Sequence, residues 1–231
     1  MDLHILSGGA AQGAVKGLQQ QFARDTGAQL QGTFGAVGMM KDKLLAGAPC
    51  DVAILTAALI DELSAGGHVV PGSRVDLGRV KTGVAVRRGD PLPDVASAEG
   101  LRASLLAARG IYFPDPEKAT AGIHFVNVLR QLGIHEQVAP FLRPYPNGAT
   151  AMAHLAQSQE PGMIGCTQVT EIRYTEGVVL VGNLPKEFEL ATMYSAGVCS
   201  KAAQPELARR LVQLLGAEST RALRESGGFE I

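Results

Sequence analysis

The chain lacks tryptophan and any cluster of positive charge, and it contains only three cysteines in 231 residues. Its formal net charge is −1 and its lysines and arginines form no run, so it presents no basic patch to a phosphate backbone or an acidic membrane surface. The few aromatic residues are scattered and offer no stacking surface for bases or sugars. These absences argue against a nucleic-acid partner and, more weakly, against a carbohydrate receptor.

Long apolar runs are also missing, which bears on the compartment. No stretch approaches the roughly 20 apolar residues of a membrane helix, so we expect no membrane insertion. No basic segment followed by an apolar one precedes the strand-like run Leu3–Leu6, so the chain as written is expected to be cytoplasmic. A signal peptide removed before Met1 would instead make it periplasmic. The cysteines, far apart in sequence, are typical of buried free thiols in a reducing compartment: Cys50, Cys166 and Cys199.

Signatures of metal, cofactor and nucleophile chemistry are absent as well. The five histidines lack metal-ligand spacing and there is no Cys-x-x-Cys, so we predict no metal and no cofactor. The segment Tyr194–Gly197 departs from the Gly-x-Ser-x-Gly pattern of serine hydrolases. Five carboxylates remain as candidate bases for proton transfer, and sequence alone does not rank them, so the catalytic residues stay unknown. They are Asp51, Asp61, Asp115, Glu117 and Glu171.

Short strand-like runs alternate with helical patterns from the start of the chain. The run Leu3–Leu6 precedes a helix to about Asp25, and the buried run Asp51–Leu55 follows a second helix. This alternation predicts an α/β fold with a mainly parallel sheet covered by helices on both faces. The theme restarts near Ser97, and the last helices begin at Pro205. We therefore expect two lobes, one formed by residues 1–82 plus 196–231 and the other by 83–195, with a polar connection leading to Val84.

Glycine-rich turns at strand-to-helix junctions are the strongest local feature. The segment Ser7–Gly13 follows a strand and opens a helix, and Gly35–Gly38 repeats the arrangement. Glycines let backbone N–H groups approach a ligand, and the start of a helix attracts negative charge. Neither segment matches the P-loop or the dinucleotide fingerprint. Both segments therefore predict a site for a small anion other than a nucleotide, although ordinary turns would also use glycine here.

Three segments are similar to a known family. They are Leu6–Gly9, Lys43–Val52 and Gly165–Gln168, and together they resemble the molybdate-binding family of type 2 periplasmic solute-binding proteins. Two further segments, Ser73–Gly78 and Gln168–Glu171, are similar to a branch that resembles aconitate isomerase. The resemblance implies a type 2 periplasmic-binding-protein fold, in which two Rossmann-like α/β lobes have a ligand cleft between them.

The resemblance also implies a set of ligand-binding residues. In the family, backbone N–H groups, hydroxyls in the first two loops and a tyrosine hold a tetrahedral oxyanion. This chain has Ala10 and Ala36 or Val37 where the hydroxyls are expected, and Gln168 in place of the tyrosine. These changes disfavour molybdate, because a hydrogen bond to a charged partner contributes roughly 1.5–3 kcal/mol. The expected contacts are Ser7, Gly8, Gly9, Ala10, Ala36, Val37, Thr56, Thr120, Ala121, Asn147, Gly148 and Gln168.

Two functions stay open. The first is a solute-binding protein that closes on a small oxyanion or carboxylate and, if exported, works with the permease of an ABC transporter. The second is an isomerase of a small unsaturated polycarboxylate such as aconitate. Because one fold serves many functions, the sequence leaves it uncertain whether the protein is an enzyme, and we favour the binding protein.

Overall fold

The computed structural model describes all 231 residues, which divide into two compact units. Unit 1 comprises Met1–Val80 and Thr192–Ile231, and unit 2 comprises Lys81–Ala191. The chain passes from one unit to the other within strands β4 (Val75–Arg87) and β9 (Ala191–Val198). No helix is both long enough and apolar enough to cross a membrane.

Unit 1 is built on a sheet in the order β2-β1-β3-β9. The first three strands are parallel, and β9 runs antiparallel to β3. The strands before β9 are β1 (Asp2–Gly8), β2 (Gln29–Gly35) and β3 (Val52–Thr56). The helices are α1 (Gln12–Thr26), α2 (Val37–Leu45), α3 (Ala57–Ala65), α9 (Pro205–Gly216) and α10 (Arg221–Gly227), with 3-10 turns at η1 (Gly9–Ala11) and η4 (Glu218–Thr220).

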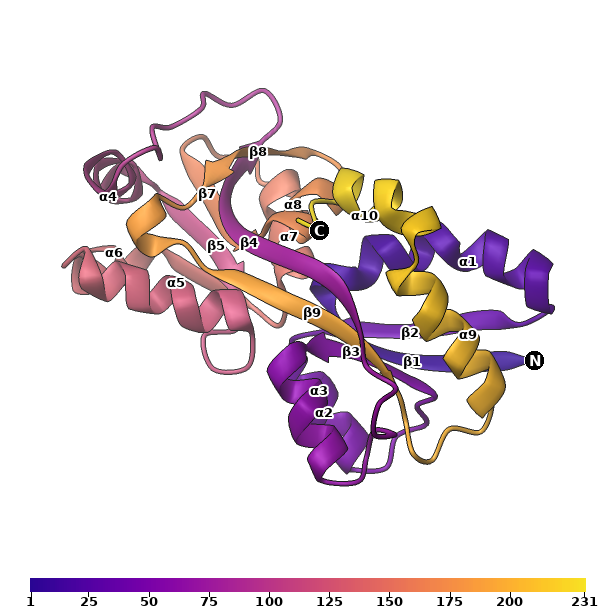
Figure 1. Ribbon diagram of the computed structural model, residues 1–231. Helices are drawn as coiled ribbons and strands as arrows, with labels where there is room; N and C mark the ends of the chain where they lie inside the picture. The colour runs from indigo at the N-terminus through magenta and orange to yellow at the C-terminus, as the bar shows by residue number, and fades with distance from the viewer. The chain divides into compact units, whose positions relative to one another are not determined.

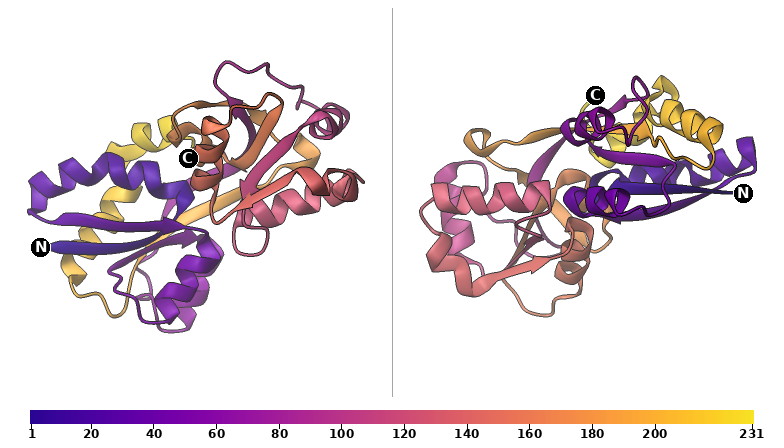
Figure 2. Two further views of the ribbon diagram at one scale, coloured as in Figure 1. Left: turned by 180° about the vertical axis from the view of Figure 1, so that it is seen from behind. Right: turned by 90° about the horizontal axis from the view of Figure 1, so that it is seen from below.

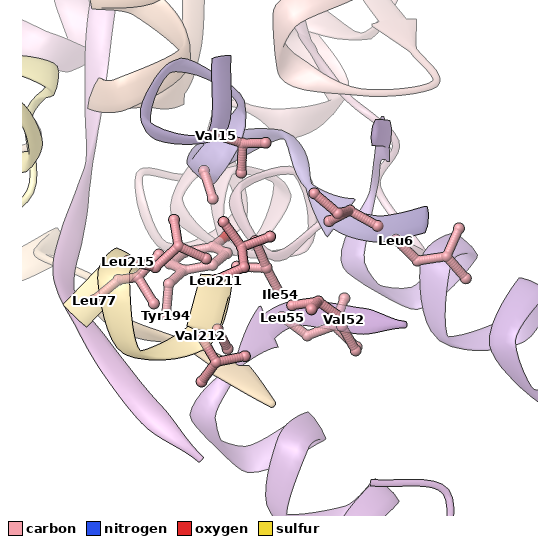
Figure 3. Close-up of a cluster of buried hydrophobic side chains, with 14 of the residues drawn as sticks. Leu6, Val15, Val52, Ile54, Leu55, Leu77, Tyr194, Leu211, Val212 and Leu215 are labelled. Carbon is pink, nitrogen blue, oxygen red and sulfur yellow. The ribbon is translucent and has the colours of Figure 1, made fainter. Parts of the chain in front are cut away.

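The helices of unit 1 follow from the spacing of their apolar residues. In α1, Val15, Leu18 and Phe22 recur every three to four positions and are all buried. The helix ends at Gly27, whose φ of 73° lies in the left-handed region that glycine adopts readily. Helices α1, α9 and α10 pack together, while α2 and α3 cover the other face of the sheet (Figure 1). Figure 3 shows side chains of β1, β3, β4, β9, α1 and α9 meeting in this core.

Unit 2 has its own sheet, in the order β8-β4-β7-β5-β6. Strands β5, β6 and β7 are parallel, and β4 is antiparallel to both β7 and β8. The strands other than β4 are β5 (Gly110–Pro114), β6 (Leu142–Tyr145), β7 (Met163–Gln168) and β8 (Val178–Asn183). The helices are α4 (Ala98–Ala107), α5 (Thr120–Gln131), α6 (His135–Val138), α7 (Gly148–Gln157) and α8 (Val169–Tyr174), with 3-10 turns at η2 (Ala139–Phe141) and η3 (Lys186–Phe188).

Alternating residues of the unit 2 strands serve two separate cores. Ile111 and Phe113 pack with the side chains of α4, α5 and α6, whereas Tyr112, between them, packs with α7 and α8. Successive residues of a strand point to opposite faces of the sheet, so both faces of β5 are buried. Figure 2 shows the helices on the two faces from behind and from below. The predicted α/β fold is confirmed.

Two expectations about the strands need correction. The stretch before Val84 was expected to be a polar connection, but β4 already begins at Val75. Its charged residues Asp76 and Arg79 are exposed while Leu77, Val80 and Thr82 are buried, so the polarity reflects exposed positions along a strand and not a loop. The sheet is also less parallel than expected, because β4, β8 and β9 pair in the antiparallel sense.

Candidate functional site

The predicted ligand-binding residues lie where parallel strands end and helices begin. In unit 1, β1, β2 and β3 lead into η1 and α1, into α2 and into α3. In unit 2, β5, β6 and β7 lead into α5, α7 and α8. Ligands of open α/β sheets typically bind at this carboxyl edge of the strands. Each predicted residue therefore occupies the edge of its own unit at which a ligand is expected.

In unit 1 the first two turns are in contact with each other. A methyl group added to Gly8 would lie 2.8 Å from Val37 Cγ1 and 3.1 Å from Tyr194 Cε1, so only glycine fits without movement. Tyr194 of β9 joins this contact and belongs to the apolar core (Figure 3). The turns after β1 and β2 are thus packed side by side, with the side chain of Val37 against the backbone of Gly8.

The side chains of this edge provide few free donors. The buried hydroxyl of Ser7 donates a hydrogen bond to the carbonyl oxygen of Gly8 at 2.8 Å, so it already has an acceptor within the loop. Thr56 Oγ1 accepts from the backbone N–H of Leu59 at 3.3 Å and caps α3. No side chain caps η1 or α2, whose first backbone N–H groups remain the donors of this edge, whereas the N–H of Gln12 at the start of α1 donates to the carbonyl oxygen of Gly9. Ala10, Ala36 and Val37 are buried and add no polar side-chain atom.

In unit 2 the start of α7 already holds a carboxylate of the protein. Asn147 accepts from the N–H of Thr150 at 2.8 Å, and Glu171 accepts from the backbone N–H groups of Gly148 and Ala149. Thr167 Oγ1 also donates to Glu171 Oε2, at 2.5 Å. A negative charge at the start of a helix is favourable. The N–H of Gly148, which sequence assigned to a ligand, is therefore engaged by Glu171.

Glu171 titrates close to neutrality. Burial raises its pKa to about 7, because the charged form loses its hydration. Hydrogen bonds from Thr167 and from the backbones of Gln168, Ala149 and Gly148 favour the charged form and limit the rise. The carboxylate fits so tightly against α7 that a methyl group on Gly148 would lie 1.9 Å from Glu171 Oε2.

The most unusual feature of unit 2 is a set of buried polar side chains without partners. Gln168 is 3% exposed, and neither its amide nitrogen nor its amide oxygen has a hydrogen-bond partner. Thr82 stands opposite Gln168 in the β4–β7 pairing, and Thr170 lies two residues further on, in α8. Both threonine hydroxyls are buried and unpartnered. We call Thr82, Gln168 and Thr170 the Gln168 group.

Burying such a group without hydrogen-bond partners destabilises the folded state. A buried polar atom left without a partner costs about 1–3 kcal/mol, and folded proteins contain few of them. Sequence reasoning identified Gln168 but missed Thr82, which fell in the supposed connection, and Thr170, whose short helix was not predicted. The apolar residues Val75, Leu77, Val80 and Val84, which follow one another with no proline between them, were the signal that could have revealed the strand carrying Thr82.

At the start of α5, Thr120 and Ala121 follow a tight turn. Asp115 Oδ1 accepts from the backbone N–H groups of Glu117 and Lys118 at 2.7 and 2.9 Å, which orders this turn. No side chain caps α5. A methyl group on Gly122 would lie 2.1 Å from the carbonyl oxygen of Asp115, so the helix begins directly against the turn. The edge of unit 2 thus offers both backbone donors and the Gln168 group.

The candidate bases differ in their surroundings. Asp51 is buried and accepts from the backbone N–H groups of His4 and Gln204 at 2.7 and 2.9 Å. Asp61 pairs with Arg74 at the surface, and Asp115 shapes its turn. Glu171 has a pKa near neutral pH. No group of three or more His, Cys, Asp or Glu side chains is placed to hold a metal ion.

Comparison with known proteins identifies the family. The family model described as "Bacterial extracellular solute-binding protein" matches residues 3–230. An aconitate isomerase from a Pseudomonas species is 29% identical over 237 residues, covering 97% of this chain and 86% of that protein. The periplasmic molybdate-binding protein of Azotobacter vinelandii has the same fold, with a TM-score of 0.81 and 19% identity over 99% of each chain. A sulfate-binding protein from Mycobacterium tuberculosis gives a TM-score of 0.74 at 14% identity, covering 99% of this chain and 86% of that one.

These findings confirm the resemblance that the sequence motifs indicated. The solved structures, all below 20% identity, establish the shared fold, and the family model spans nearly the whole chain. The chain therefore belongs to the bacterial extracellular solute-binding protein family, as a solute-binding protein that resembles the molybdate-binding members.

Proposed function

We propose that the protein binds a small organic anion bearing two or three carboxylates. The observation that carries the proposal is the buried amide of Gln168, which has no partner for either of its polar atoms. A glutamine amide donates through nitrogen and accepts through oxygen. A fully ionised tetrahedral oxyanion can only accept, so it would leave the amide oxygen unpaired. A carboxylate next to a hydroxyl or carboxylic acid group would satisfy both atoms.

The first-unit residues support the same ligand class. Ala10, Ala36 and Val37 provide no hydroxyl, and the hydroxyl of Ser7 donates a hydrogen bond to the carbonyl oxygen of Gly8. In unit 1 we assign the remaining contacts to the backbone N–H groups of η1 and to the uncapped start of α2, and in unit 2 to the uncapped start of α5. Neutral backbone donors hold carboxylates well without a dedicated arginine. Asn147 and Gly148 remain lesser candidates, because their side chain and N–H already have partners.

Isothermal titration calorimetry tests this proposal. Molybdate, tungstate and sulfate would be titrated alongside dicarboxylates and tricarboxylates, some with and some without a hydroxyl. We expect saturable heat with a polycarboxylate and at least tenfold weaker binding of the inorganic oxyanions. Absence of heat and of a thermal shift with every compound would refute the proposal.

A second candidate function is isomerisation of an unsaturated polycarboxylate, favoured by the Pseudomonas aconitate isomerase that matches 97% of the chain. Moving a double bond requires a group that exchanges protons near neutral pH. Glu171, with its pKa of about 7, is the carboxyl best suited to this exchange. A binding protein would release its ligand unchanged, whereas an isomerase would convert it.

Incubation with trans-aconitate distinguishes the two functions. Chromatography would follow the appearance of cis-aconitate, with Glu171→Gln as the variant and Glu160→Gln, at an exposed position before β7, as the matched control. If the protein is an isomerase, we expect the wild type and the control to convert trans-aconitate and Glu171→Gln to lose most of this activity. An unchanged mixture at high protein concentration would eliminate this substrate and leave the binding function.

The matching family is described as one of extracellular solute-binding proteins. We therefore propose that this protein meets its ligand outside the cytoplasm and delivers it to an ABC transporter permease. Fractionation of the native cells with an antibody against the protein tests the location. Recovery in the periplasmic or extracellular fraction is expected. Recovery with cytoplasmic markers would contradict delivery to a permease and would favour the isomerase.

A further inference from the structure

Two of the three buried thiols lie in contact inside unit 1. The Sγ atoms of Cys50 and Cys199 are 3.3 Å apart, although the two residues stand 149 positions apart in the sequence. The backbone N–H of Cys199 donates to the carbonyl oxygen of Asp51 at 2.9 Å, directly beyond the pairing of Val52 with Val198. The β3–β9 register thus places Cys199 opposite Asp51, the chain neighbour of Cys50, and so brings the two cysteines together.

The separation is close to that needed for a covalent bond. A disulfide has an S–S distance of about 2.05 Å, so the sulfurs have only a little more than 1 Å to move. Rotation of a cysteine side chain about its Cα–Cβ bond moves Sγ while its own backbone stays in place. Cys166, by contrast, belongs to the core of unit 2 and serves as an internal control.

The segment between the two cysteines contains all of unit 2. It also contains both crossings of the chain, because β4 leaves unit 1 after Cys50 and β9 returns before Cys199. A disulfide between Cys50 and Cys199 would join the two segments of unit 1 to each other without involving any residue of unit 2. Cross-links that close long loops restrict the unfolded chain most, so the effect on stability should be large.

We propose that Cys50 and Cys199 form a disulfide bond when the protein folds in the presence of a small-molecule disulfide. The thiolate of Cys50 attacks the oxidant, whose S–S bond breaks, and one small thiol leaves after taking up a proton. The thiolate of Cys199 then attacks the mixed disulfide, forming the protein disulfide and releasing the second thiol. Two protein thiols are oxidised and one small-molecule disulfide is reduced to two thiols.

The timing of this reaction follows from burial. In the folded protein the hydrogen bond with Cys50 and the loss of hydration raise the pKa of the Cys199 thiol, which disfavours the reactive thiolate. Oxidation of the two thiols is therefore faster before strands β3 and β9 pair and bury them. Once formed, the bond is protected from reducing agents by the same burial.

The test is oxidative refolding of the full chain in a mixture of oxidised and reduced glutathione. We expect an intact mass lower by two hydrogen atoms and a peptide pair joining Cys50 to Cys199. We also expect the Tm to exceed that of the reduced protein by about 5–10 °C. Cleavage by a protease within unit 2 should give fragments that separate on a gel only after reduction.

Matched variants assign the bond. Cys166→Ser should keep the mass change, the linked peptides and the rise in Tm, whereas Cys50→Ser and Cys199→Ser should lose all three. Full alkylation of both thiols after oxidative refolding would overturn the proposal. A bond from either cysteine to Cys166, or glutathione adducts without a cross-link, would overturn it equally.

Discussion

The two units differ in how far their buried polar side chains are hydrogen-bonded. Each buries one carboxylate, Asp51 in unit 1 and Glu171 in unit 2, and each carboxylate accepts hydrogen bonds from backbone N–H groups. In unit 1 the other buried hydroxyls also have partners, as Ser7 has in the Gly8 carbonyl. In unit 2 the Gln168 group has none. In unit 1 only Arg224 Nε has no partner, and the other nitrogens of that guanidinium donate to backbone carbonyls, whereas in unit 2 a whole amide and two hydroxyls point to a partner from outside the chain.

The largest expected effect comes from disturbing the Glu171 contact. In Gly148→Ala the new methyl group meets Glu171 Oε2 at 1.9 Å and Thr167 Oγ1 at 2.0 Å, both held by hydrogen bonds. We expect a loss of about 3 kcal/mol in the free energy of unfolding, measured by urea denaturation. Gly227→Ala is the control, because nothing lies within 4 Å of its added methyl group. Equal stability of the two variants would contradict the tight packing.

The corresponding change in unit 1 should do less. In Gly8→Ala the closest atoms are the side chains of Val37 and Tyr194, which can shift, and the nearest backbone atom is 3.7 Å away. We expect a loss of roughly 1–2 kcal/mol. A greater loss than in Gly148→Ala would reverse the comparison between the units.

Burial of Glu171 also makes the free energy of unfolding depend on pH, by an amount similar to the effect of Gly148→Ala. The pKa of Glu171 is raised from 4.5 to about 7 in the folded protein, so between these values the folded state holds a proton that the unfolded state releases. Its contribution to stability is fully present below pH 4.5 and is lost as the pH rises through about 7. The change is of the order of 3 kcal/mol.

Urea denaturation at a series of pH values measures this contribution. Glu171→Gln should have a flatter profile between pH 4.5 and 8, while the exposed Glu117→Gln should follow the wild type. A profile of Glu171→Gln parallel to that of the wild type would show that the carboxyl does not titrate in this range.

Sequence predicted the fold well where local signals decide it. The helix predicted to about Asp25 ends at Thr26, before Gly27, and the predicted buried run Asp51–Leu55 lies almost entirely in β3. The early start of β4 was missed because exposed charged residues interrupt its apolar ones, and α8 is too short to show a periodicity.

The site was predicted only in part, for a physical reason. Gln168 could be found from its position in a family motif, but Thr82 is its neighbour only through strand pairing, which depends on the tertiary fold. In the same way, nothing near Gly148 in sequence indicates that Glu171 occupies the start of α7. Contacts between distant parts of the chain decide which of the predicted donors remain free.

The smallest expected effect has opposite signs in the two units. Ser7→Ala removes a hydroxyl that has a partner, so we expect a loss of about 1 kcal/mol. Thr170→Val removes a hydroxyl without one, so we expect no loss or a gain of up to about 1 kcal/mol. Thermal unfolding of both variants measures the difference. Destabilisation by Thr170→Val similar to that by Ser7→Ala would mean that its hydroxyl already has a role in the fold.

Calorimetry of the wild type and Gln168→Met tests the central claim, that the unpartnered amide of unit 2 serves a ligand. Methionine has a similar length and no amide, so the variant should be at least as stable as the wild type. We predict that the wild type binds a tricarboxylate and that Gln168→Met binds it at least tenfold more weakly. Unchanged affinity in the stable variant, or a preference of the wild type for molybdate, would contradict the account.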